Sequence, residues 1–312
     1  MKKIFILLVG ILMLATACQT TTDDSNTNKR YYGGSDGLDV TFVEGEPPDQ
    51  VLDGSQDIFD ITLLVDNIGE EDISPGEVIV TLNGIERDVF QLNSLTEKNE
   101  NEIRGVHRIG DRKENGDQDE VRFKSARYND VLPFDFEISM RADICYEYGT
   151  EAVADVCLKK DASARRTEDK CEISNDNVEI ENSGSPMRIA NFVQSARGSN
   201  KIQFIFDVES IGGGDYFPTG NFVDSCTTDE RNDDTVNIAV DFIRSDVSVD
   251  CTPFGGSNGE IRLVSGKRTV RCTVDTSNMQ EIAFERPMRI KLDYMYKTSK
   301  DKTFIVESTQ DF

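Results

Sequence analysis

The chain has 312 residues, with 58 acidic and 34 basic side chains and a formal net charge of −24. A surface this acidic repels nucleic acid and anionic lipid, because both are bound through cationic patches. It favours solubility and attracts cations or basic partners. The length suits two domains. The absence of tryptophan argues against antibody-type domains, which bury one against their disulfide.

Residues 1–17 are predicted to be a signal peptide. Two lysines precede an apolar run over residues 4–15, which is shorter than the roughly 20 residues that span a bilayer. Small residues lead into Cys18, so we expect this cysteine to be acylated as in lipoproteins, with ordinary signal-peptidase cleavage as the alternative. Residues 18–34 then form a lipid-anchored, flexible tether. Stable anchoring needs more than one acyl chain.

Cysteine number supports an extracellular location, on the outer face of the cell membrane. Six cysteines remain after Cys18, and an even number suits disulfides in an oxidising compartment. Proximity in sequence favours Cys145–Cys157 across a turn at Gly149 and Cys251–Cys272, which leaves Cys171–Cys226. Six cysteines allow 15 pairings. Metal binding by these cysteines is disfavoured, because there is one histidine and no Cys-x-x-Cys. The six are Cys145, Cys157, Cys171, Cys226, Cys251 and Cys272.

Apolar and polar residues alternate along many short segments, which predicts strands with one buried face. In the first part of the chain the segments are Leu38–Phe42, Ile61–Val65, Val78–Leu82, Val121–Phe123 and Phe136–Tyr148. In the second part they are Met187–Phe192, Ile202–Val208, Val236–Phe242, Val247–Val249, Ile261–Val264, Val270–Val274 and Ile290–Tyr296. Turn sequences such as Asn83-Gly84 and Ser265-Gly266 separate them. No window shows a helical period of useful length, so the fold class is all-β.

Two blocks of sequence recur in the same order. Ile61–Gly69 recurs as Phe204–Gly212 with an offset of 143, and Met140–Thr150 recurs as Met288–Thr298 with an offset of 148. Similar offsets indicate a duplicated domain rather than chance similarity of β-rich stretches. About seven short strands per copy are typical of an immunoglobulin-like sandwich.

The expected organisation is therefore two tandem immunoglobulin-like β-sandwich domains, residues 35–162 and 163–312. The boundary is placed in the charged segment Lys159–Lys170. The repeated tyrosines are expected in the core with their hydroxyls at its rim, and an exposed aromatic strip for sugar or protein is the alternative. They are Tyr146, Tyr148, Tyr294 and Tyr296.

The alternating strand that ends in Val65-Asp-Asn-Ile-Gly69, followed by a proline-bearing turn and Val78–Leu82, resembles CARDB-like and S-layer-associated β-sandwich domains of archaeal surface proteins. The larger layout is similar to uncharacterised archaeal surface lipoproteins with two such domains. Its shared points are Gly37-Leu38, Pro47-Pro48-Asp49, Cys145-Tyr146-x-Tyr148 and Tyr294-x-Tyr296. This resemblance implies an extracellular adhesion or scaffold role and transfers no catalytic residue.

Catalytic motifs are weak. Gly33–Gly37 and Gly255–Gly259 match the Gly-x-Ser-x-Gly elbow of serine hydrolases, but strands are expected after both, and no histidine follows the second. We interpret both as glycine-rich turns. His107, the only histidine, lies among arginines and is expected on the surface. Triads and most zinc hydrolases are excluded on inventory, so no enzyme is predicted, although a carboxylate pair for glycoside hydrolysis stays open.

Calcium is the one candidate ligand, and no other cofactor is expected. The segment 111–120 resembles an EF-hand loop, but Lys113 and Arg122 occupy ligand positions. A second acidic loop follows Cys226. The candidate calcium ligands are Asp111, Asn115, Asp117 and Asp119, or Asp229, Glu230, Asp233 and Asp234.

The sequence thus predicts a non-enzymatic extracellular lipoprotein that acts in surface adhesion, as a scaffold or in envelope assembly. The membrane is its expected partner through the lipid, together with a surface protein or glycan. The alternative is a calcium- or carbohydrate-binding accessory module of a transporter or enzyme. The step from a sandwich fold to a role is an analogy.

Overall fold

The computed structural model describes residues 29–110, 112–220, 226 and 234–310. Every regular element in these residues is a β-strand, as the alternation predicted, and the strands form several sheets. No helix within the described ranges is long and apolar enough to cross a membrane. Cys18 and the signal peptide lie outside the described residues.

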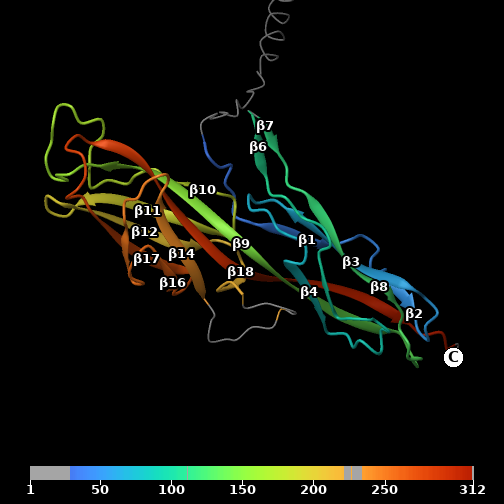
Figure 1. Cartoon of the computed structure of the whole chain (residues 1–312). Helices are drawn as coiled ribbons and strands as arrows, with labels where there is room; N and C mark the ends of the chain where they lie inside the picture. The colour runs from blue at the N-terminus through green and yellow to red at the C-terminus, as the bar shows by residue number, and fades with distance from the viewer. Residues whose placement is uncertain (1–28, 111, 221–225, 227–233, 311–312) are drawn as a thin grey trace, which may run out of the picture.

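The molecule is elongated and has two lobes (Figure 1). In the N-terminal lobe a three-stranded sheet of order β1-β3-β8 covers part of a larger sheet, and β6 and β7 form a separate hairpin. The first strands of the chain are β1 (Leu38–Phe42), β2 (Gln50–Leu52), β3 (Phe59–Asn67), β4 (Val78–Asn83), β5 (Thr96–Lys98), β6 (His107–Ile109), β7 (Arg112–Glu114), β8 (Gln118–Ala126) and β9 (Phe136–Leu158).

The C-terminal lobe repeats this layering with a four-stranded sheet of order β11-β12-β17-β15. The remaining strands are β10 (Glu181–Asn182), β11 (Met187–Ala196), β12 (Lys201–Ser210), β13 (Asp215–Phe217), β14 (Thr235–Phe242), β15 (Asp250–Thr252), β16 (Asn258–Arg262), β17 (Lys267–Asp275) and β18 (Phe284–Glu307).

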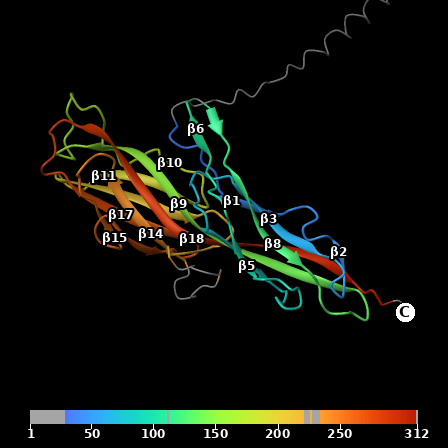
Figure 2. The same ribbon diagram turned by 45° about the vertical axis from the view of Figure 1, so that its right-hand side comes forward.

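The strands β9 and β18 run through both lobes and pair with each other along their whole length (Figure 2). They have 23 and 24 residues, whereas strands usually have about 5–6. They form the centre of a nine-stranded sheet, in which β4 and β10 extend the β9 side and β14, β13 and β2 the β18 side. We call this strand pair the central ribbon.

The central ribbon also crosses the predicted domain boundary. The last residues of β18, Ile305–Glu307, lie parallel to β2 in the N-terminal lobe, although the sequence assigned them to the second domain. The segment Lys159–Lys170 is held in place, because Lys159 is buried and forms an ion pair of 3.0 Å with Asp169. The connection between the lobes is therefore part of the folded body.

Most strand predictions agree with the structure, with three corrections. Val247–Val249 precedes the strand β15 and is not itself a strand. The segments Phe136–Tyr148 and Ile290–Tyr296 are each part of a much longer strand. Gly149 is not in a turn, since β9 continues through it. The alternation of buried residues along β9 keeps its phase across Gly149, which explains why the strand does not end there.

The recurring blocks make the same contacts in both lobes. The amide groups of Ile68 and Gly69 donate to the carbonyl of Gly37, and those of Ile211 and Gly212 donate to the carbonyl of Pro186, all at 2.9–3.0 Å. In each lobe the amide two residues after this glycine donates to a tyrosine hydroxyl. Glu71 donates to Tyr148 (3.3 Å), and Gly214 donates to Tyr296 (2.7 Å).

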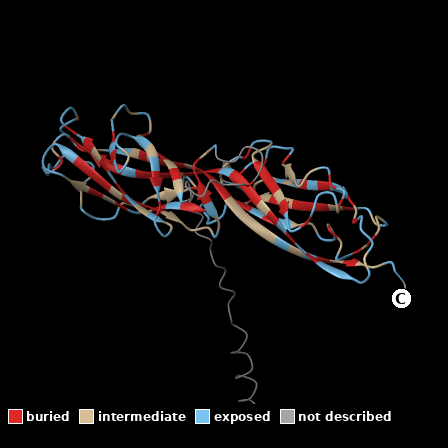
Figure 3. Cartoon of the chain, turned by 90° about the horizontal axis from the view of Figure 1, so that it is seen from below, coloured by how far each residue is buried: buried red, intermediate tan, exposed pale blue. Residues whose placement is uncertain are grey.

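The central ribbon pairs equivalent positions of these blocks. Tyr146 lies opposite Tyr296 and Tyr148 opposite Tyr294, while Glu147 lies opposite Met295, its own equivalent at the offset of 148. Because equivalent residues are paired in antiparallel fashion, the ribbon has a local two-fold relation at this point. Most buried apolar residues form one core that extends through both lobes (Figure 3), and a second, small cluster surrounds the Cys145–Cys226 bond.

Candidate functional site

The four repeated tyrosines form the centre of the core rather than an exposed strip. All are at most 5% exposed. The ring of Tyr146 lies 5.7 Å from that of Tyr148 and 5.5 Å from that of Tyr296, and the Tyr294 hydroxyl is 3.0 Å from Oγ1 of Thr150. Burial raises the pKa of Tyr148 and Tyr294 well above the ordinary value. The burial of the tyrosines in the core is confirmed, but the Tyr294 hydroxyl lies inside the core rather than at its rim, and an aromatic binding strip at these positions is wrong.

Two of the three disulfides join partners that the sequence did not favour. The bonds are Cys145–Cys226, Cys157–Cys171 and Cys251–Cys272. Only the last was among the favoured pairs. Cys145 and Cys157 cannot meet across a turn, because both lie on the straight strand β9. Their partners come instead from segments that pack beside this strand.

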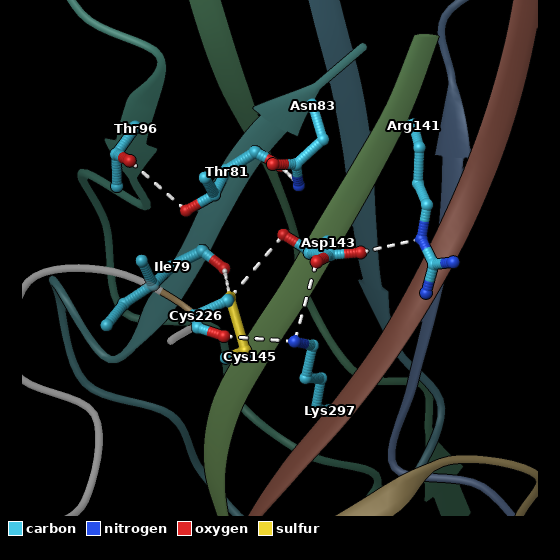
Figure 4. The surroundings of a disulfide bond; sticks show 9 residues. All are labelled: Ile79, Thr81, Asn83, Thr96, Arg141, Asp143, Cys145, Cys226 and Lys297. Atoms are coloured by element: carbon cyan, nitrogen blue, oxygen red, sulfur yellow. Dashed lines mark hydrogen bonds and ion pairs between the residues drawn. A yellow bond between two sulfur atoms is a disulfide. The ribbon is translucent and has the colours of Figure 1, made fainter. Parts of the chain in front are cut away.

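The Cys145–Cys226 bond attaches the segment after β13 to the central ribbon (Figure 4). Nζ of Lys297 on β18 donates to the carbonyl of Cys226 (3.0 Å) and lies 3.4 Å from the Asp143 carboxylate on β9. Asp143 also accepts from Arg141 at 2.8 Å. These contacts join a residue of the C-terminal half of the sequence to both strands of the ribbon.

Neither glycine motif precedes a helix: Gly33–Gly37 is an irregular segment before β1, and the second motif runs from a bend at Gly255 into β16. The Ser35 hydroxyl donates to its neighbour Asp36 (2.7 Å), and the first glycines of both motifs have positive φ angles, which suits turns. His107 lies on β6, where Nδ1 is 3.1 Å from the Gly105 carbonyl oxygen and Nε2 is 3.5 Å from the Glu114 carboxylate. Its ring therefore contacts neither of the two motif serines.

Two carboxylates of the first candidate calcium loop, Asp117 and Asp119, have partners within the protein. Asp117 pairs with Arg104 at 2.7 Å, and this hydrogen bond lowers the pKa of Asp117. Asp119 accepts from the amide groups of Glu100 and Asn101, both at 3.0 Å. Burial opposes its ionisation, but the hydrogen bond from the Asn101 side chain (2.9 Å), with those from the amides, outweighs it and lowers the pKa of Asp119. Asn115 is exposed in the loop before β8.

The other candidate ligands are largely outside what the structure describes. This holds for Asp111, Asp229, Glu230 and Asp233. Asp234 is described and lies in a turn directly before β14. Within the described ranges, no cluster of three or more histidine, cysteine or acidic side chains is arranged to hold a metal.

The segment predicted as a flexible tether joins the folded body from Arg30 onward. The Arg30 guanidinium lies 3.0 Å from Asp155 and 3.2 Å from Glu181. The Glu70 carboxylate accepts from the amides of Tyr32 (3.0 Å), Gly33 (2.9 Å) and Gly184 (2.7 Å). Glu70 thus holds the entering chain and a loop of the C-terminal lobe together, so the N-terminal segment reaches the body near its middle rather than at an end (Figure 1).

Four exposed apolar side chains lie in the segments just before β3 and between β8 and the start of β9, at the far end of the N-terminal lobe. We call this group the apolar tip, and Phe134 is its most exposed member at 64%. Exposed carboxylates accompany it in sequence at Asp130, Asp135 and Glu137. The members are Ile58, Val131, Phe134 and Phe136.

Buried Asp53 fixes the loop that carries the apolar tip. Its carboxylate accepts from the amide of Leu132 (2.6 Å) and from the amide (3.0 Å) and hydroxyl (2.6 Å) of Thr309. The hydrogen bond from the Thr309 hydroxyl, with those from the two amides, lowers the pKa of Asp53. A fixed loop loses less entropy on binding a partner. Sequence reasoning missed both Asp53 and Glu70, because single acidic residues do not stand out in so acidic a chain.

A groove of about 230 Å³ in the N-terminal lobe lies between β5 and β8. Its lining mixes acidic and basic side chains, including Glu97, Glu100, Arg122 and Lys124. Phe123, its aromatic residue, is almost fully buried. The groove therefore lacks the exposed aromatic face on which sugars usually stack.

No protein-family model matches the chain, and no characterised protein matches it significantly in sequence. Among solved structures, the secreted serine protease VesC from Vibrio cholerae is similar over 82% of this chain, with 11% identity and a TM-score of 0.20. The chain covers 50% of that protein's length. Collagen adhesin from S. aureus is also similar, with 8% identity, a TM-score of 0.12 and coverage of 91% of each chain. The E. coli adhesin CfaE has 10% identity and a TM-score of 0.10, with coverage of 90% of this chain and 85% of that protein.

Proposed function

We propose that the chain is a non-enzymatic surface lipoprotein, in which two tandem immunoglobulin-like β-sandwich units form a rigid adhesion or scaffold module outside the membrane. The observation that carries this proposal is the central ribbon. At about 3.3 Å per residue, its strands extend for roughly 75 Å. A body of this shape holds surfaces far apart at a fixed distance, which is a mechanical rather than a catalytic property.

The ribbon supports rigidity because bending between the lobes would break its ladder. Each backbone hydrogen bond contributes about 1 kcal/mol net to stability, and the ladder is continuous from Phe136–Val306 to Leu158–Phe284. The Cys145–Cys226 bond and the buried tyrosines lie at the middle of this ladder. The lobes should therefore move together.

The apolar tip is the surface that we assign to a protein partner. Its exposed Phe134 lies among acidic residues, so a complementary partner presents an apolar pocket with a basic rim. Aromatic side chains in such settings often contribute most of the binding energy. The proposed CARDB-like relationship agrees with this role, and it stays a prediction.

The anchor is tested with Cys18→Ala. If Cys18 carries the lipid, the wild-type chain sediments with membranes and is cleaved by protease added to intact cells, whereas the variant is released into the medium. Equal membrane retention of both proteins would contradict the anchor. A wild-type chain that protease reaches only after lysis would contradict the extracellular location.

The partner is tested by placing a photo-crosslinking amino acid at Phe134 in intact cells. A discrete cross-linked species at this position is expected. Val264 is a matched control, because it is equally exposed (66%) but lies in the C-terminal lobe. The same pattern of cross-links at both positions, or none at Phe134, would contradict a specific role for the tip.

The alternative of a calcium-binding module gains no support from the described acidic residues, since Asp117 and Asp119 already have partners within the protein. A calcium-dependent rise in melting temperature, reversed by chelator, would favour that alternative through linkage.

A further inference from the structure

The loop Lys159–Lys170 contains the only pair of adjacent arginines in the sequence, Arg165 and Arg166. The loop follows the end of β9 in the C-terminal lobe (Figure 1). The stretch Arg165–Glu168 is exposed and lies outside the strands, and the Arg165 side chain is 85% exposed. Exposed loops with small and polar residues are the preferred sites of proteolytic cleavage, so this stretch is a candidate substrate for proteases that recognise basic residues.

Few contacts hold this stretch to the rest of the protein. The hydrogen bonds that the structure gives for the backbone of Ser163–Glu168 all have their partners within the loop itself. The two guanidinium groups form ion pairs at the surface, Arg165 with Glu172 (2.8 Å) and Arg166 with Glu281 (2.5 Å). Exposed ion pairs contribute little to stability. The stretch can therefore detach and extend in a protease cleft without opening the core.

The base of the loop is fixed, in contrast to its exposed stretch. Nζ of the buried Lys159 lies 3.0 Å from the Asp169 carboxylate, and Cys157 is bonded to Cys171. A cut between these anchors leaves an ion pair and a disulfide that join its two sides. Other exposed arginines lie on strands, as Arg262 does on β16, where detachment would break the ladder with β14.

We infer that the peptide bond between Arg165 and Arg166 is a processing site for extracellular proteases that cleave after arginine. Such enzymes bind the arginine side chain in a pocket with a carboxylate at its base. Water is the co-reactant: its hydroxyl bonds to the Arg165 carbonyl carbon, the C–N bond breaks, and its hydrogen goes to the Arg166 nitrogen. This inference rests on the proposed extracellular location, but not on the lipid or on the apolar tip.

The product is a two-chain protein whose chains stay together. The cut lies between Cys157 and Cys171 and also between Cys145 and Cys226, so two disulfides join the fragments. The central ribbon joins them as well, because β9 belongs to the first fragment and β18 to the second, and the two strands pair along their whole length. The proposed rigid body therefore survives the cut.

The new amino terminus has a partner in place before the cut. The backbone N–H of Arg166 donates to Oδ2 of Asp169 at 3.1 Å, and Nζ of Lys159 donates to the same oxygen at 3.0 Å. Cleavage turns the Arg166 amide into an ammonium group, and a charged donor makes a stronger hydrogen bond to a carboxylate than a neutral one. We expect the cut end to stay at the base of the loop and to resist further trimming.

Limited digestion of the mature chain with trypsin, under native and non-reducing conditions, tests the site. The expected product has a new amino terminus at Arg166 and separates into two fragments only after reduction and denaturation. Removal of the residues before Tyr31 does not affect this readout. A first cut on a strand, or a cut protein whose melting temperature falls by more than about 5 °C, would overturn the inference.

Arg165→Gln and Arg166→Gln together should slow this cut at least about 100-fold, because a pocket built to pair a cation rejects a neutral side chain. The matched control is Arg197→Gln, an exposed arginine in the tight hairpin between β11 and β12, where its amide donates to the Lys201 carbonyl (2.8 Å). The control should be cut like the parent, and both variants should keep the parent's melting temperature. An unchanged rate in the double variant, or equal protection in the control, would contradict the assigned bond.

The chain recovered from intact cells, with protease inhibitors added at harvest, tests whether the site is used. On reduction we expect two fragments from the wild type and one chain from the double variant, and a single wild-type chain would overturn the inference. Trypsin added to intact cells separates this result from the proposed location. If trypsin cuts the purified chain but not the chain on cells, the extracellular location is wrong, whatever Cys18→Ala shows about the lipid.

Discussion

The two lobes place a tyrosine hydroxyl against a glycine in the same way, but they stabilise their cores differently. The N-terminal lobe uses buried polar side chains. Asn67 donates to two carbonyls, and Asn99 makes three hydrogen bonds to the backbone, at 2.7–3.0 Å. Asp53 fixes its outer loop. No disulfide lies within the described part of this lobe alone.

The C-terminal lobe uses aromatic packing and covalent bonds. Phe192 stacks on Phe206 with ring centroids 5.9 Å apart and also contacts Phe204. Two disulfides, Cys157–Cys171 and Cys251–Cys272, close short segments of chain. The comparison shows that one layout tolerates two kinds of core, because the layout depends on strand pairing rather than on the residues that fill it.

The largest expected effect is on the C-terminal lobe. Replacing Cys251 and Cys272 by alanine opens a loop with a sequence separation of 21 and should lower the free energy of unfolding by about 3 kcal/mol. Hydrogen exchange should show lost protection in β12 and β17 and little change in β3 and β8. Equal loss in both lobes would break the contrast between them.

The shared tyrosine–glycine contact is tested with Gly69→Ala and Gly212→Ala. A Cβ atom at Gly69 would lie 2.0 Å from the Tyr148 hydroxyl, and one at Gly212 would lie 2.3 Å from that of Tyr296. Each variant should lose about 1–3 kcal/mol of stability in urea denaturation. Gly213→Ala is the matched control, because a Cβ there meets nothing within 4 Å. A loss in only one lobe would show that the contact is not equivalent.

The polar core of the N-terminal lobe is tested with Asn99→Ala. The change leaves the amide of Val78 without its acceptor at 2.8 Å and should cost about 2 kcal/mol, measured by urea denaturation. Asn83→Ala, at an exposed asparagine of the same lobe, should cost much less. Similar effects of the two substitutions would mean that buried amides do not hold this lobe together.

The smallest expected effect concerns Glu71, beside the Tyr148 hydroxyl. Burial raises the pKa of Glu71, so its contribution to stability is complete below the unfolded pKa of about 4.3 and is lost as the pH rises through the folded value. Glu71→Gln should therefore raise the melting temperature at pH 7, by about 2 °C or less, and leave it unchanged at pH 4. A lower melting temperature at pH 7 would contradict burial as the dominant cause.

Strand pairing explains which parts of the fold could be predicted. The short strand Leu38–Phe42 was predicted with its exact bounds, since alternation is a local signal. The polar run Lys297–Lys302 gave no such signal, yet it is strand because β9 pairs with it throughout. In β9 the alternation that predicts a strand continues at even-numbered positions up to Leu158. It was not used beyond Tyr148, because Gly149 was interpreted as a turn.

The candidate sites follow the same division. The interpretation of the glycine motifs as turns needed only local chemistry. The loop behind the apolar tip was missed, because it combines residues whose neighbours are set by the fold: Asp53 meets Leu132 and Thr309.

The amino-acid order alone determined that this chain is all-β, which face of most strands is buried and that two blocks recur, since each of these is a periodicity readable along the chain. The tertiary structure alone decided that two strands traverse both lobes, that Cys145 bonds to Cys226 and that the entering segment is held at mid-body. These features join segments far apart in sequence, and their proximity depends on the order of strands in the sheet, which no local pattern encodes.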